Sequence, residues 1–98
     1  MQKDNHYIDT YSKINKVTKE LAEFLNEKNK RYGDSALNPI NIFNKHDADI
    51  GLCLRMDDKI SRIRNSEELR KNDIVDLMGY LTLLCISKGW LDFKDQID

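Results

Sequence analysis

Four carboxylates form two pairs with a spacing of three residues, a pattern suited to holding a hard metal ion. The pairs are Glu20 with Glu23 and Asp73 with Asp76. Residues three apart lie on one face of a helix, so two such helices packed together would present four oxygen ligands. Magnesium prefers oxygen ligands and keeps several waters, which leaves room for the phosphates of a substrate. The alternative is an ordinary solvated surface, because 34% of the residues are charged.

A second group of side chains is suited to binding phosphate. Arg55, Lys59 and Arg62 are spaced to project from one side of a helix, with Asp58 beside them. The guanidinium group is planar and offers paired N–H donors that match phosphate oxygens. We predict that these cations contact phosphates and that Asp58 orients them or holds magnesium. The alternative is a solvated helix face on which the cations pair locally with Asp58.

The stretch EKNKRYGDS adds candidates at the end of a predicted helix. Its cations are Lys28, Lys30 and Arg31, which suit the negative end of a helix dipole and are also candidates for binding phosphate. The rings of Tyr32 and, further along the chain, Tyr80 are candidates for stacking on a base or ribose. Packing at a helix edge is the alternative for both tyrosines.

Apolar residues recur at helical spacing in three segments, which predicts three long helices. The expected helices cover residues 10–32, 48–64 and 66–88. Gly33 and Gly89 suit the left-handed residue that ends a helix. After Gly89 we expect a short final helix or tail, with Trp90 and Phe93 as its anchors.

The expected helix at residues 48–64 has a predicted core face opposite its cations. That face consists of Leu52, Cys53, Met56, Ile60 and Ile63. Cys53 and Cys85 lie far apart in apolar patterns, so we expect two buried free thiols, with a disulfide as the alternative.

Residues 81–86 are apolar nearly all round, which is typical of a helix buried on both sides. A chain of 98 residues can hardly surround one of its own helices. We therefore expect one all-α domain over residues 1–98, a small bundle of three long helices and a short C-terminal helix, completed by assembly as a homodimer or tetramer. Asp76 is expected to be buried at a subunit boundary, as a metal ligand or as the partner of Arg55 or Arg62.

The composition argues against several other classes of protein. Sixteen basic and seventeen acidic residues give a net charge of −1, so we expect no binding to duplex DNA. There is no long apolar run or signal peptide, which predicts a cytoplasmic protein with no membrane partner. No glycine-rich phosphate loop, Ser-His-Asp order or CxxC motif supports P-loop or covalent chemistry.

Three stretches, in the same order, resemble the small bacteriophage family called nucleotide modification associated domain. The stretches are ELAEFLNEKNKRYGDS, IGLCLRMDDKISRI and NDIVDLMGYLTLL. The family shows a Lys-x-x-x-Tyr-Gly-x-Ser helix end, an Arg-x-x-Asp-Lys-x-x-Arg helix and an Asp-Leu-x-x-Tyr helix. The matching residues are Lys28, Tyr32, Gly33 and Ser35, then Arg55, Asp58, Lys59 and Arg62, then Asp76, Leu77 and Tyr80. The resemblance covers roughly residues 16 to 88.

That family is similar in turn to the all-α nucleoside triphosphate pyrophosphatases of the MazG and dimeric dUTPase type. Those enzymes hold magnesium with a Glu-x-x-Glu helix and a Glu-x-x-Asp helix, and they cut between the α and β phosphates. The resemblance implies a magnesium site at Glu20, Glu23, Asp73 and Asp76, and a phage protein that works in the cytoplasm of a bacterial host.

Three functions follow as expectations. The first is binding of a phosphorylated nucleotide, with magnesium-dependent release of pyrophosphate if the chain is an enzyme. The second is a non-catalytic sponge that sequesters a nucleotide-derived immune signal and so inhibits an anti-phage defence. The third is a helical adaptor that binds a host protein through residues 81–86.

Overall fold

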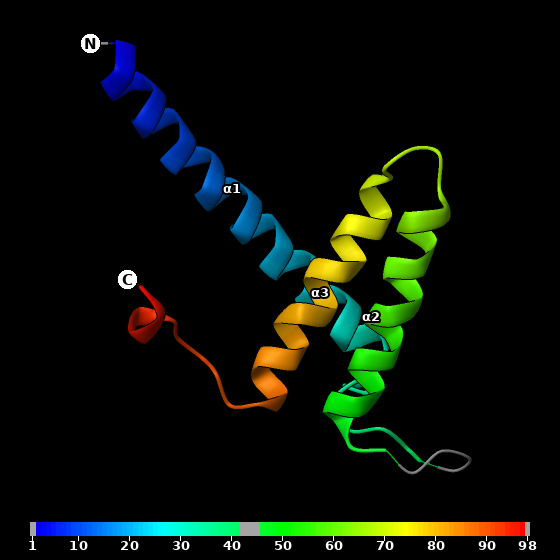
Figure 1. The fold of residues 1–98 in the computed structure, drawn as a ribbon. Coiled ribbons are helices and arrows are strands. Elements are labelled where there is room, and N and C mark those ends of the chain that lie inside the picture. Colours follow the sequence, from blue (N-terminus) through cyan, green and yellow to red (C-terminus); the bar gives the residue numbers. More distant parts are fainter. Residues whose placement is uncertain (1, 42–45, 98) are drawn as a thin grey trace. The chain divides into compact units, whose positions relative to one another are not determined.

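The chain is all-helical in a computed structural model that describes residues 2–41 and 46–97, with side chains from residue 6 onward. Its elements are α1 (Gln2–Arg31), α2 (Ala48–Asn65), α3 (Lys71–Ser87) and a 3-10 turn, η1 (Lys94–Gln96) (Figure 1). The prediction of an all-α fold with three helices is therefore confirmed. The expected C-terminal helix is only this three-residue turn. The chain divides into two compact units, residues 1–33 and 34–98, and each is described by itself.

Helix α1 begins at Gln2, earlier than the predicted start at Thr10. The residues before Thr10 include no proline or glycine, so nothing in their backbone stops the helix from extending. The predicted end of the helix is confirmed within one residue. The amide of Tyr32 donates to the carbonyl of Lys28 at 3.0 Å, and Gly33 follows with a φ of +61°.

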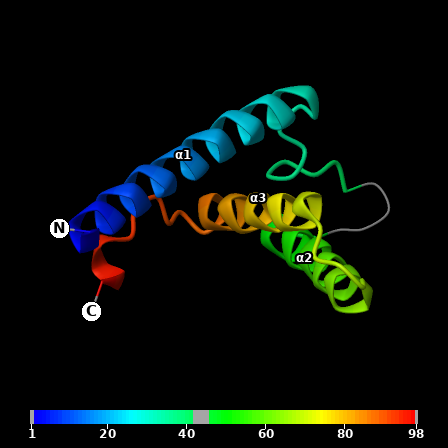
Figure 2. The same cartoon turned by 90° about the horizontal axis from the view of Figure 1, so that it is seen from above.

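Helices α2 and α3 lie side by side as a hairpin in the unit of residues 34–98 (Figures 1 and 2). The bounds predicted for α2 are confirmed within one residue, but α3 begins at Lys71 and not at Ser66. Ser66 instead ends α2. Its amide donates to the carbonyl of Ile63 at 3.3 Å, and its hydroxyl donates to the carbonyl of Glu68 at 2.6 Å. The serine that suggested a helix start thus closes the preceding helix and shapes the loop.

Helix α2 buries part of its predicted core face, and the prediction is confirmed at Leu52 and Met56. Its buried residues are Leu52, Met56 and Lys59. Cys53 is exposed, and Ile60 is 53% exposed, although both were expected in the core. The spacing of four and then three residues is the usual seam of a helix against one neighbour, and a lysine occupies one of its positions.

The end of α3 follows the chemistry expected of Gly89. This residue has a φ of +77°, and its amide donates to the carbonyl of Ile86 at 3.0 Å. The next amide, of Trp90, donates to the carbonyl of Cys85 at 2.8 Å. This pair of bonds is the Schellman arrangement that a left-handed residue makes possible. Beyond it, Trp90 and Phe93 are both exposed, so within the described residues neither anchors the tail.

Two further findings concern the thiols and the membrane. Cys53 and Cys85 are both free, as expected, but the first is exposed and the second is half-buried. Within residues 2–41 and 46–97, no helix combines the length and the apolar character needed to cross a bilayer.

Candidate functional site

The polar cluster between α2 and α3 is built around Lys59. The side chain of Lys59 is only 8% exposed, so the prediction that it lies on an open cationic face is wrong. Its stem lies on the seam with Leu52 and Met56, where a four-carbon chain can replace an apolar residue. The ammonium group at its end needs partners because a buried charge without them is costly.

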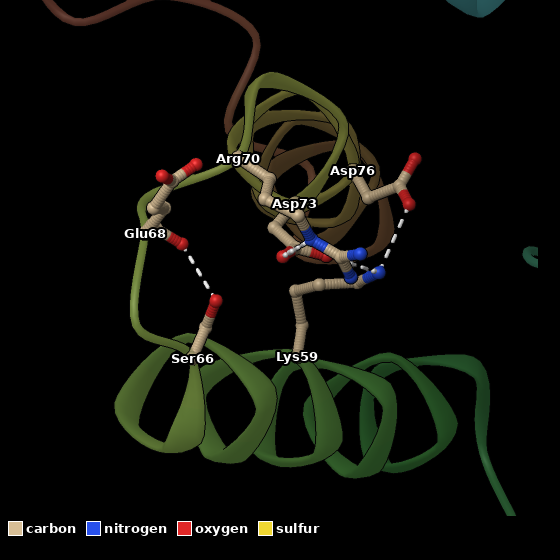
Figure 3. A network of polar contacts seen from close by, with 6 residues as sticks. All are labelled: Lys59, Ser66, Glu68, Arg70, Asp73 and Asp76. Carbon is tan, nitrogen blue, oxygen red and sulfur yellow. Dashed lines mark hydrogen bonds and ion pairs between the residues drawn. The ribbon is translucent and has the colours of Figure 1, made fainter.

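Two aspartates of α3 supply those partners (Figure 3). The Nζ atom of Lys59 donates to Oδ1 of Asp73 at 3.3 Å and to Oδ2 of Asp76 at 3.0 Å. The side chain of Asp73 is 1% exposed, and that of Asp76 is 25% exposed. Asp76 is therefore partly buried, as expected, but the structure pairs it with a lysine of α2 and not with Arg55 or Arg62.

Arg70 is the fourth member of the cluster, and the sequence analysis did not single it out. Its Nε atom donates to Oδ2 of Asp73 at 3.2 Å, while its side chain is 58% exposed. Both oxygens of Asp73 thus carry a cationic donor. The signal was present in the sequence, because Arg70 and Asp73 have the same three-residue spacing as the carboxylate pairs.

The surroundings shift the pKa values of this cluster in opposite directions. Burial raises the pKa of Asp73, but the hydrogen bonds from Arg70 and Lys59 outweigh it and hold the pKa below its ordinary value of 3.8. The hydrogen bond to Asp76 raises the pKa of Lys59 above 10.5, against burial, with Asp73 adding to the rise. Both pKa shifts keep Asp73 and Lys59 ionised at neutral pH, so the carboxylate of Asp73 already carries cations.

Arg55 and Arg62 lie beside the seam and remain exposed. They are seven residues apart on α2, so they project from the same side of the helix, about 10 Å apart along its axis. In the part of the chain that the structure describes, neither guanidinium group has a hydrogen bond or ion pair. Asp58 is exposed next to them and likewise makes no such bond there. Tyr80, on α3, is half-buried.

The candidates at the end of α1 belong to the other unit. The Nζ atom of Lys28 lies 5.2 Å from the ring centre of Phe24, and Nε of Arg31 lies 3.0 Å from Oε1 of Glu27. Lys30 and Tyr32 are exposed. The cations of this helix end are therefore near the side chains of their own helix, and Tyr32 presents its ring to solvent.

The four predicted magnesium ligands divide between the two units. Glu20 and Glu23 are exposed on α1, where Nζ of Lys16 lies 3.6 Å from Oε2 of Glu20. Asp73 and Asp76 lie in the hairpin. Among the described residues, no group of three or more histidine, cysteine, aspartate or glutamate side chains is placed to hold a metal ion. In the hairpin, the position between the two carboxylates is taken by an ammonium group.

Two other polar or hollow features lie toward the open end of the hairpin. Nζ of Lys88 forms an ion pair with Oδ2 of Asp49 at 3.0 Å, with both side chains partly exposed. The hydrogen bond between them lowers the pKa of Asp49 and raises that of Lys88. A hollow of about 470 Å³ is lined by the tail, residues 89–93, 95 and 96, and it includes none of the predicted ligand residues.

Comparison of the chain with protein-family models, with curated proteins and with solved structures found no match. The resemblance to the nucleotide modification associated domain therefore stays a prediction.

Proposed function

We propose that the chain binds a phosphorylated nucleotide, or a nucleotide-derived signal, through Arg55 and Arg62 and holds it without cutting it. The observation that carries this proposal is the contrast between free and occupied charges. Two exposed guanidinium groups have no partner within the described residues, whereas the aspartates of α3 are occupied by Lys59 and Arg70.

The two arginines have the chemistry of a phosphate site. Each offers paired donors to an anion. Because both side chains are exposed, the protein without a ligand buries no unpaired charge at this position. Their separation of about 10 Å along α2 is bridged by long side chains, so both can reach neighbouring phosphates of one ligand. Tyr80, half-buried on the adjacent helix, is the proposed stacking residue for a base. We place this ligand near a boundary between copies of the chain, in a homodimer or tetramer.

The same contrast argues for retention over hydrolysis. A magnesium ion at Asp73 and Asp76 has to displace an ammonium group that already makes hydrogen bonds of 3.3 and 3.0 Å. Enzyme activity of the MazG type remains the alternative proposal, with magnesium held by Glu20, Glu23, Asp73 and Asp76. Its chemistry would be release of pyrophosphate from a nucleoside triphosphate.

One experiment separates the two proposals. The purified protein is titrated calorimetrically with tripolyphosphate and with a panel of linear and cyclic nucleotides, in EDTA and then in magnesium. Each nucleotide is afterwards recovered from the denatured protein and examined by mass spectrometry. Retention predicts binding in EDTA and recovery of intact ligand. Hydrolysis predicts pyrophosphate that appears only with magnesium and disappears in Glu23→Gln.

The variants test the assigned arginines. Arg55→Gln and Arg62→Gln are each expected to weaken binding at least tenfold, since a charge-assisted hydrogen bond contributes about 1.5–3 kcal/mol. Arg64→Gln is the matched control, because this arginine is also exposed on α2 and unpaired within the described residues. Equal affinities for wild type and both variants would refute the proposed site.

An adaptor that binds a host protein is the second candidate. The exposed apolar side chains of α3 and of the tail that follows it favour this function. Leu81 and Ile86 are exposed on α3, and the tail adds exposed Trp90 and Phe93. Exposed large apolar side chains are typical of protein contacts where they form a patch, and the adaptor function proposes such a patch here. If this function is correct, Ile86→Asp will abolish copurification of a host protein while nucleotide binding is unchanged.

A further inference from the structure

Helix α1 carries an apolar seam that repeats every seven residues. In heptad notation its a positions are Tyr7, Ile14, Leu21 and Lys28, and its d positions are Thr10, Val17, Phe24 and Arg31. Tyr11 and Leu25 occupy e positions beside this seam. The pattern is apolar at its centre and polar or cationic at one end, which is typical of a helix that packs against another helix over a defined length.

The seam is exposed in the structure. Tyr7 is 74% exposed and Ile14 is 57% exposed, and Val17 and Phe24 are also exposed. The unit of residues 1–33 contains only this helix. A lone helix is only marginally stable in water, and most helix stability in proteins comes from burying such a face. The seam therefore needs an occupant.

We propose that the occupant is α1 of a second copy of the chain. The two helices pack antiparallel, and the two-fold axis crosses the seam at the level of Lys19. In this register Val17 packs against Leu21 of the partner subunit, and Ile14 packs against Phe24 of the partner subunit. The two-fold axis repeats each contact, so four apolar layers form the centre of the pair. At the flank, Tyr11 lies against Leu25 of the partner subunit.

The charges beside the seam select this orientation. Lys13 occupies a g position opposite Glu27 of the partner subunit, and symmetry makes two such pairs. Within its own helix Lys13 also lies 2.9 Å from Asp9, so each cation has an anion on both sides. Glu20 meets its own copy at the axis, where Lys16 is 3.6 Å from the carboxylate of the same chain. Opposite charges thus meet along most of the flank.

A parallel pair in register is opposed by the same residues. It places Lys28 against its own copy at an a position and Arg31 against its own copy at a d position, so four cations meet at one end of the seam. Like charges at facing positions destabilise a coiled coil and choose its orientation. The antiparallel register moves those cations opposite Thr10 and Tyr7, at the ends of the seam. The inference uses none of the proposed ligand residues of α2 and does not depend on a nucleotide.

Spin labels measure the orientation directly. In a chain with Cys53→Ser and Cys85→Ser, single cysteines replace Ser12, Lys19 or Asn26, which are exposed on the side of α1 away from the seam. The antiparallel pair predicts the shortest distance between labels at position 19, with an added axial separation of about 21 Å at positions 12 and 26. Equal distances at the three positions indicate a parallel pair, and absence of any dipolar signal indicates a monomer. Either result overturns the proposal.

Charge reversal provides a second test with an internal control. Lys13→Glu and Glu27→Lys are each expected to raise the dissociation constant about tenfold, because each replaces two flanking attractions by repulsions. The variant that combines both changes restores the attractions between the two helices with reversed sign, but it loses the ion pairs with Asp9 and Arg31 within each helix. It is therefore expected to recover part of the affinity that either single variant loses. Failure of the double variant to recover would contradict the register.

Ile14→Asp tests the seam itself against a matched substitution. Ile8 lies on the same helix and is exposed to a similar degree, but it occupies a b position off the seam. Ile14→Asp is expected to give a monomer by sedimentation velocity, while Ile8→Asp leaves the dimer intact. Circular dichroism of both variants is recorded at one protein concentration. Because a lone helix is only marginally stable, Ile14→Asp is expected to lose helix content together with the dimer, and Ile8→Asp is expected to keep it. Equal effects of the two substitutions would show that the seam is not the contact.

Discussion

Replacing Lys59 by methionine tests whether the ion-pair cluster holds the α2–α3 hairpin together. Methionine keeps the unbranched stem that packs on the seam and removes the ammonium group. Loss of packing is therefore small, because a volume-conserving change costs less than about 1.5 kcal/mol. The main effect is on the two aspartates that lose a donor at 3.3 and 3.0 Å.

The magnitude follows from the exposure of those aspartates. Asp76 is 25% exposed, so water can replace the lysine there at little cost. Asp73 is 1% exposed and retains only Arg70, at 3.2 Å, on its other oxygen. Removing one partner of a buried ion pair typically costs 3–5 kcal/mol, and the remaining arginine places Lys59→Met at the lower end, about 3 kcal/mol.

The appropriate assay is urea denaturation monitored through hydrogen exchange of the α2 and α3 amides. These amides report on unfolding of the hairpin and not on unfolding of α1. Lys59→Met should lower the urea midpoint with an unchanged slope. Lys71→Met is the control, since Lys71 is exposed and makes no ion pair among the described residues. Adding Asp73→Asn to Lys59→Met should recover part of the loss, because the side chain that is 1% exposed then carries no charge, while Arg70 and Asp76 are exposed enough for water to solvate them. An unchanged or raised midpoint for Lys59→Met would refute the reasoning.

Three further predictions concern the same hairpin. Its free energy of unfolding should be constant near neutral pH, fall as the pH drops below 3.8 toward the lowered pKa of Asp73, and fall again as the pH rises above 10.5 toward the raised pKa of Lys59. A pH series of urea midpoints checks this; a loss of stability between pH 6 and 8 would contradict it. Leu52→Ala removes a fully buried side chain and should cost about 2–5 kcal/mol by the same assay, whereas exposed Leu54→Ala should be nearly neutral. Lys88→Ala removes a partly exposed ion pair and should lower the thermal midpoint far less than Leu52→Ala, so a comparable drop would show that this pair contributes more than its exposure implies.

The helices and their ends could be predicted because local chemistry controls them. Apolar spacing located all three helices, and the glycines at 33 and 89 adopt the left-handed conformation expected at helix ends. The start of α3 could not be predicted from Ser66, because a serine hydroxyl satisfies backbone groups equally well at the end of a helix or at its beginning. Ser66 does the former.

The candidate site was predicted in its residue types but not in its pairing. Asp73 and Asp76 were predicted as metal ligands, which stays a prediction. Arg55 and Arg62 were predicted as exposed cations, and the structure keeps both arginines exposed. Lys59 was assigned to the wrong face, since a periodicity that scores lysine as polar directs it to solvent. Arg70 was missed, although it precedes Asp73 by three residues within the helix predicted over residues 66–88.

The amino-acid sequence by itself determined which segments are helical, where they stop and which residues could carry charge chemistry, because these properties depend on neighbours a few residues away. Only the tertiary structure decided that Lys59 turns inward. A charged lysine can be buried at low cost only where carboxylates accept hydrogen bonds from its ammonium group. Those carboxylates belong to another helix, fourteen and seventeen residues further along the chain. The position of α3 against α2 therefore sets the role of Lys59.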